Sequence, residues 1–111
     1  MSILTITEYV GLMTTQSASG ARAQVPMEQP IAEQTLAVTA SSATSAAFNA
    51  LTTVVRLNAD GGGAIAITFG LSPTASIPSG GAGSSRLASN ATEYRGVQRG
   101  IGMKLAAIAT T

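Results

Sequence analysis

The fold class follows from residues 54–69, which read VVRLNADGGGAIAITF. Apolar and polar side chains alternate on both sides of the glycines, and β-branched residues are frequent, as in strands with one buried face. We therefore expect one strand over residues 52–58 and a second over residues 64–69. The run 60–63 between them predicts a turn, because glycine adopts positive φ without steric cost and weakens a strand interior. The whole pattern predicts a β-hairpin.

Short segments of the same texture follow and precede this pair, separated by Gly, Ser, Pro and Asn. We expect strands at 35–39, 93–97 and 103–109, the last two joined by a turn over residues 98–102. Residues 70–85 are rich in Gly, Ser and Pro and predict a long loop. The predicted fold is all-β, an antiparallel β-sandwich or a jelly-roll-like barrel.

Residues 1–34 differ from the rest, and we expect an extended N-terminal arm there, followed by a β-sandwich domain over residues 35–111. Pro26 and Pro30 fix their own φ and favour extended geometry in the residue before each of them. The large apolar side chains of the arm need a cover, which either the chain's own domain or a neighbouring molecule supplies. These candidate assembly-interface residues are Tyr9, Val10, Leu12, Met13, Val25, Met27 and Ile31.

One internal segment, residues 40–51, is ambiguous. Its alanines favour a short helix capped by Ser41 or Ser42, whereas its Ser, Thr and Asn side chains compete for backbone hydrogen bonds. Both a helical turn and an irregular link remain open for this segment.

The composition excludes most catalytic and metal-binding arrangements. Ala, Thr, Ser and Gly supply just over half of the 111 residues, and the chain contains no His, no Cys and no Trp. Because no base stands near a serine and the carboxylates are not clustered, we expect no catalytic residue, no metal site and no cofactor. Glu93 and Arg95, two residues apart on one strand face, indicate a surface ion pair. The sequence therefore predicts a protein that is not an enzyme.

Charge is scarce, with 10% of residues charged and a net charge of +1. Residues 34–55 and 61–85 carry none, and such a surface favours association with other molecules. The Arg residues are dispersed and few aromatic residues accompany them, so we expect no nucleic-acid partner. Polar residues interrupt the uncharged run 34–55 and the first residues lack a basic region, so we expect neither a membrane span nor a cleaved signal.

Four segments together resemble one class of proteins: VVRLNAD (54–60), ITFGLSPTA (67–75), TEYRGV (92–97) and KLAAI (104–108). Their order is similar to that in small β-rich structural proteins of tailed bacteriophage virions, including proteins that decorate or cement the head. The resemblance covers residues 35–109. It implies a β-sandwich subunit that oligomerises, with a trimer as one form, on an icosahedral shell. It also implies two partners, the major capsid protein and copies of this chain, in the phage head after synthesis in the host cytoplasm.

The leading expectation is thus a capsid decoration or cement protein, or a minor capsid protein, whose residues 1–34 contact its neighbours. Strap-like segments bind by adding backbone hydrogen bonds at sheet edges and placing alternate side chains in pockets. One alternative is a tail or fibre component that binds a host-surface glycan through the loop 70–85, with Phe69 and Tyr94 as the nearest aromatic platforms. Another is a neck or tail protein that forms a ring.

Overall fold

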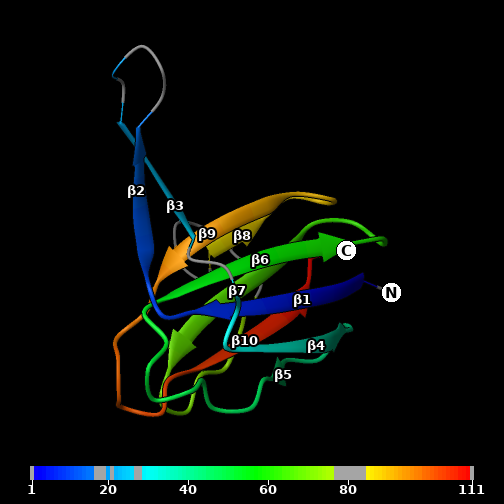
Figure 1. Cartoon of the computed structure of the whole chain (residues 1–111). Helices are drawn as coiled ribbons and strands as arrows, with labels where there is room; N and C mark the ends of the chain where they lie inside the picture. Colours follow the sequence, from blue (N-terminus) through cyan, green and yellow to red (C-terminus); the bar gives the residue numbers. More distant parts are fainter. Residues whose placement is uncertain (1, 17–19, 21, 27–28, 77–84, 111) are drawn as a thin grey trace.

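The computed structural model describes residues 2–16, 20, 22–26, 29–76 and 85–110. All regular structure in this part of the chain is β, and two antiparallel sheets of four strands each make up the body (Figure 1). The predicted all-β class is confirmed. Among these residues there is no helix of the length and hydropathy needed to cross a membrane.

The first sheet contains, in spatial order, β4 (Ala32–Val38), β1 (Ser2–Tyr9), β6 (Val54–Asp60) and β9 (Thr92–Gly96). The second sheet contains, in spatial order, β5 (Ala43–Thr44), β10 (Lys104–Ala109), β7 (Ile65–Gly70) and β8 (Ser85–Leu87). A separate two-stranded sheet consists of β2 (Leu12–Gln16) and β3 (Arg22–Pro26).

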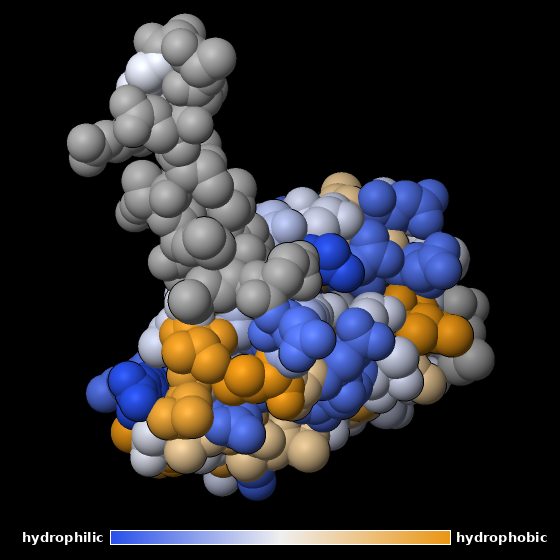
Figure 2. Space-filling view, viewed as in Figure 1, coloured by the Kyte–Doolittle hydropathy of each residue, from blue (hydrophilic) through white to orange (hydrophobic). Residues whose placement is uncertain are grey.

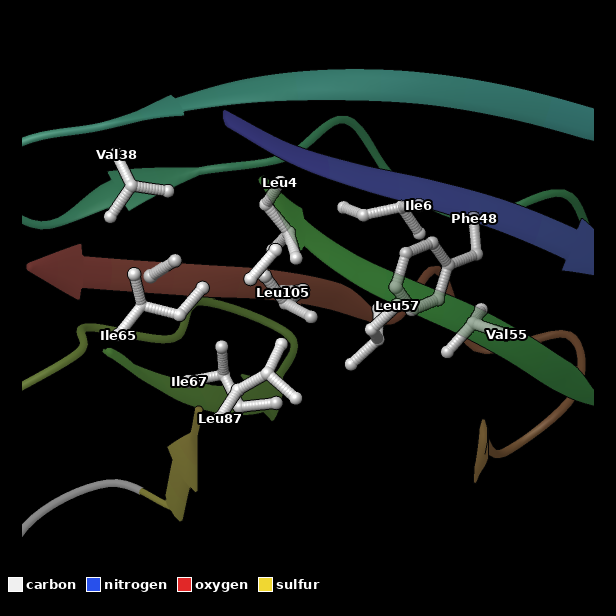
Figure 3. Packing of buried hydrophobic residues seen from close by; sticks show 12 residues of the cluster. Leu4, Ile6, Val38, Phe48, Val55, Leu57, Ile65, Ile67, Leu87 and Leu105 are labelled. Carbon is white, nitrogen blue, oxygen red and sulfur yellow. The ribbon is translucent and has the colours of Figure 1, made fainter. Parts of the chain in front are cut away.

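The two large sheets share one hydrophobic core, which follows from the period-2 pattern of their strands. In β6, Val55, Leu57 and Ala59 are fully buried, while the residues between them are partly exposed. Buried side chains from both sheets meet between the sheets (Figure 3), among them Leu4, Ile6, Leu57, Ile65, Ile67, Leu87 and Leu105. Burying each Leu or Ile contributes roughly 1.5–3 kcal/mol. The body is sandwich-like, and the alternation predicted for residues 52–58 and 64–69 is confirmed.

The hairpin predicted around the three glycines is wrong, because its two strands belong to different sheets. β6 pairs with β1 and β9, whereas β7 pairs with β10 and β8. Gly61, Gly62 and Gly63 have φ values of 78°, 59° and 130° and carry the chain from one sheet to the other. The predicted turn 98–102 likewise links β9 in the first sheet to β10 in the second. The apolar faces of β6 and β7 therefore meet across the core and do not lie side by side.

The extended arm predicted over residues 1–34 is not confirmed. Ser2–Tyr9 forms β1, an inner strand with β4 on one side and β6 on the other. Leu4 and Ile6 of β1 are fully buried in the core. The physical reason is that apolar and threonine residues alternate here, which gives the strand one apolar face for the core to cover. The predicted boundary after residue 34 falls within β4.

Residues 40–51 contain no helix. β5 lies at the edge of the second sheet, and the loop after it places Phe48 in the core, 6% exposed (Figure 3). The ring centroid of Phe48 lies 6.3 Å from that of Phe69 on β7. β8 follows the predicted loop 70–85, of which residues 77–84 lie outside the described part of the chain.

β2 and β3 form a hairpin that projects from one end of the body, and the molecule measures 46 × 29 × 25 Å (Figure 1). We call this end of the body the hairpin end. β1, β7 and β9 finish there, and β4, β6 and β10 begin there. The two ends of the described chain lie at the opposite end of the body.

Candidate functional site

Within the residues that the structure describes, the surface of the hairpin end contains five segments that are distant in the sequence: 10–11, 29–31, 45–53, 71–73 and 97–103. Backbone hydrogen bonds hold several of them together. Thr53 donates its N–H to the carbonyl of Tyr9 (3.0 Å), and its own carbonyl accepts from the N–H of Val97 (2.9 Å). The N–H of Phe48 donates to the carbonyl of Met103 (2.9 Å). These bonds fix the positions of the loops relative to one another.

Large apolar side chains are exposed at the hairpin end. Among residues 2–11, 29–76 and 85–110, six large hydrophobic residues are exposed, and four of them lie in these segments. The four are Val10, Leu51, Leu71 and Ile101, exposed by 39%, 47%, 57% and 41%. Figure 2 shows hydrophobic surface gathered beside the base of the hairpin. Apolar side chains that gather in one region mark an interaction site, whereas isolated ones need no explanation.

Glu8 holds the loop that carries Leu51. Its side chain lies on the inner face of β1 and is 3% exposed. Its Oε1 accepts hydrogen bonds from the N–H of Asn49 (2.7 Å) and from the hydroxyl of Thr52 (2.8 Å). The Oδ1 of Asn49 in turn accepts from the N–H of Leu51 (2.9 Å). A buried carboxylate needs such donors, and here they connect the strand β1 to the tip of the loop.

Three of the predicted arm residues lie just before or after the hairpin in the sequence, and they differ in how exposed they are. Tyr9 is 2% exposed at the end of β1, so it belongs to the body and is not available to a neighbour. Val10, the next residue, is exposed at the hairpin end. Ile31 is partly buried at the base of the hairpin, and its N–H donates to the carbonyl of Glu8 (2.9 Å). Of these three, Val10 is the one that an approaching molecule meets.

The other predicted arm residues belong to the hairpin itself. The register of β2 and β3 pairs Leu12 with Pro26 and Met13 with Val25. These are the two pairs nearest the body, since the hairpin turns between residues 16 and 22. These apolar residues are therefore at positions near the base of the hairpin, and Val10 precedes them in the chain. Met27 lies outside the described residues.

Three exposed residues of the hairpin end, Leu51, Leu71 and Ile101, were not among the predicted interface residues. All three lie in links between strands, where the sequence offers no periodic pattern. Leu71 and Ile101 are each flanked by glycine or serine on both sides. A large apolar residue between such small neighbours in a turn has no adjacent side chain to cover it, and this spacing is the signal that could have identified them.

The opposite end of the body contains a hollow of about 270 Å³. It is lined by Ser2, Val38, Thr39, Ala40, Gly62, Ala64 and Ala109. The hydroxyl of Ser2 donates to the carbonyls of Gly61 (3.2 Å) and Gly63 (3.4 Å), which braces the glycine turn. None of the described residues that line the hollow is charged. No three His, Cys, Asp or Glu side chains of the described residues are grouped as metal ligands would be.

The ion pair predicted between Glu93 and Arg95 is confirmed. The Nη2 of Arg95 lies 2.8 Å from the Oε1 of Glu93, and the two side chains are 30% and 40% exposed, respectively. A pair this exposed contributes about 0–1 kcal/mol to stability. The pair lies on β9, which forms one edge of the first sheet.

The two aromatic residues considered for glycan binding are not brought together. Phe69 lies on β7 in the second sheet and packs against the core beside Phe48. Tyr94 lies on β9 in the first sheet and is 50% exposed. The described residues therefore do not form an aromatic platform of two rings.

Comparisons of the chain with protein-family models, with curated proteins and with solved structures found no match.

Proposed function

We propose that the chain is a non-enzymatic structural subunit of a tailed-bacteriophage virion, a decoration or cement protein or a minor capsid protein, that binds the head shell through its hairpin end. The observation that carries this proposal is the common position of the β2–β3 hairpin and the exposed Val10, Leu51, Leu71 and Ile101. The resemblance of residues 35–109 to small β-rich virion proteins supports the choice of partner.

The hairpin supports the proposal because it is incomplete as a structural unit. A two-stranded hairpin is marginally stable in water, and further strands or a packed face are needed to stabilise it. Within the described residues, β2 and β3 pair only with each other. A neighbouring shell protein would supply the missing contacts. Because a shell repeats the same contact at many positions, weak individual contacts are sufficient for firm attachment.

A jelly roll is the finer fold that we propose for the body. The connections from β4 to β5, from β6 to β7 and from β8 to β9 each pass from the first sheet to the second or back. β10 in the second sheet and β1 in the first sheet form a fourth pair of this kind if the last strand of the body is taken to precede the first. The four pairs then contain all eight strands of the two sheets. Jelly rolls occur in viral capsid and lectin domains, so the fold agrees with the proposal without identifying the function.

A hairpin-less variant tests the proposal. The carbonyl of Glu8 accepts from the N–H of Ile31, so the two ends of the hairpin meet at the body and a short Gly-Ser linker can replace residues 11–29. Purified protein is mixed with heads of the phage that encodes it, and the heads are sedimented. We expect saturable binding of the full chain and loss of binding for the hairpin-less variant.

Substitutions at the hairpin end provide a second variant with the hairpin intact. The triple change Leu51→Ser, Leu71→Ser and Ile101→Ser is expected to weaken binding to heads by at least about tenfold, since each side chain loses apolar contact area. The matched control is Ile3→Ser, because Ile3 is 44% exposed on β1 near the other end of the body. Binding that is unchanged in both the hairpin-less and the triple variant would rule out the hairpin end as the contact, and a full chain that ignores the heads would rule out the proposed function.

A further inference from the structure

The four edge strands of the body differ in how accessible their edges are. β5 and β8 contain only two and three residues. β4 is seven residues long, and the side chain of Gln34 on its inner face binds the backbone of Ala46 twice, through Nε2 to the carbonyl (3.3 Å) and through Oε1 to the N–H (3.0 Å). β9 is five residues long, and no described strand pairs with its outer edge (Figure 1). Short edges offer few backbone groups for pairing, so β4 and β9 are the longer edges of the body, and of these two β9 is the one that carries charges of both signs.

The hydrogen bonds between β6 and β9 show which backbone groups of β9 face outward. Before β9, the carbonyl of Ala91 accepts a hydrogen bond from the N–H of Ala59 on β6 (3.1 Å). After β9, the N–H of Val97 donates to the carbonyl of Thr53, the residue before β6 (2.9 Å). Bonding direction alternates along an antiparallel strand, so every second residue from 91 to 97 directs its backbone toward β6. The remaining residues direct their N–H and C=O groups outward: Thr92, Tyr94 and Gly96.

The side chains of β9 are self-complementary about its central residue. In an antiparallel pair of two β9 strands centred on Tyr94, Glu93 of each copy lies opposite Arg95 of the other. Opposite charges directly across a strand pair attract, and like charges in these positions repel. Tyr94 lies opposite its own copy on the outer face, where it is 50% exposed in the single chain. All the outward backbone groups of one strand then find partners on the other.

We propose that β9 is a self-pairing edge, at which two copies of this chain join antiparallel about a two-fold axis at Tyr94, so that their first sheets form one continuous sheet. The charge complementarity of Glu93 and Arg95 under this axis identifies the occupant as a second copy. Charged residues on an edge strand normally discourage pairing. Here Glu93 and Arg95 would repel a strand that places a like charge opposite either of them, so they favour pairing with a second copy of β9. This inference does not depend on the proposed virion function.

Charge substitutions on β9 test the proposal by size-exclusion chromatography with light scattering over a range of protein concentrations. The wild-type chain is expected to form dimers. E93R places two Arg residues opposite each other at both positions, and R95E does the same with Glu. Each variant is expected to raise the dimer dissociation constant by about tenfold or more, with a smaller effect at high salt. A mixture of E93R and R95E, and the double variant E93R/R95E, restore opposite charges and are expected to restore dimers.

Two further variants guard against indirect effects. R86E makes the same kind of charge change at exposed Arg86 on β8 and is expected to leave the dimer intact. Y94P removes an N–H that faces outward, so it blocks edge pairing while the hydrogen bonds between β9 and β6 remain. If a charge variant fails to fold, as judged by circular dichroism, the Y94P result decides. The proposal is overturned by a wild-type chain that stays monomeric at every concentration, by a dimer that persists in Y94P, or by equal loss in R86E.

Discussion

Replacing Glu8 by Ala removes the acceptor that two donors of the hairpin end share. Thr52 is 1% exposed, so its hydroxyl would be left without a partner where water does not reach, at a cost of about 1–3 kcal/mol. The N–H of Asn49 lies in an exposed loop, so water replaces the carboxylate there and the cost is only about 0.5–1 kcal/mol. We expect Glu8→Ala to lower the free energy of unfolding by about 1.5–4 kcal/mol, a large part of the ~5–15 kcal/mol typical of a domain.

Glu8→Gln separates the hydrogen bonds from the charge. Gln keeps an acceptor oxygen of similar position, so both donors retain a partner and the expected loss is about 1 kcal/mol. Urea unfolding of the three proteins, followed by circular dichroism, gives the differences. Hydrogen exchange at the N–H groups of Asn49 and Leu51 should become faster in the Ala variant and change little in the Gln variant. A loss below about 1 kcal/mol for Glu8→Ala, or equal losses for Ala and Gln, would refute the reasoning.

Three further predictions concern the body, all measured by urea unfolding. Gln34→Ala is expected to cost about 1–2 kcal/mol and to speed hydrogen exchange at Ala46, because both bonds between this side chain and the backbone of Ala46 are lost; unchanged exchange would show that the amide does not hold the loop. Leu57→Ala leaves a cavity in the core and is expected to cost about 2–5 kcal/mol, against less than half as much for Val54→Ala on the partly exposed face of the same strand. Gly100 has φ 80°, and an added Cβ would meet no atom within 4 Å, so Gly100→Ala should cost about 1–2 kcal/mol from backbone strain alone and Gly100→Asn less; equal costs would contradict that cause.

The alternation of residues in β6 and β7 was enough to predict two strands and their buried faces, but not their partners. Period-2 patterning indicates which face of a strand is apolar. That face is buried equally well whether the next strand of the chain pairs beside it in the same sheet or belongs to the opposite sheet. The pairing was therefore predicted wrongly around Gly61–Gly63. Residues 4–7 alternate in the same way and were available as a signal for β1. The prolines at 26 and 30 obscured this signal, because they suggested one continuous extended segment.

The candidate site was predictable only in part. Val10 was identified from its place in an apolar N-terminal region, whereas Leu51, Leu71 and Ile101 come together only because the sheets bring the ends of many strands to one side of the body. The role of Glu8 has no signal in the sequence, since its donors lie 41 and 44 residues away along the chain. Contacts of this range depend on the strand order, which the local pattern does not contain.

The hollow at the far end of the body brings Ser2 and Ala109 to one place, although they stand at opposite ends of the strand sequence. A short engineered linker between these positions, combined with an opening in the turn between β2 and β3, would give a polypeptide that begins with β3 and ends with β2, with every strand of the body intact. Its new termini would stand at the tip of the projection, so a foreign epitope fused there would be displayed well clear of the protein surface.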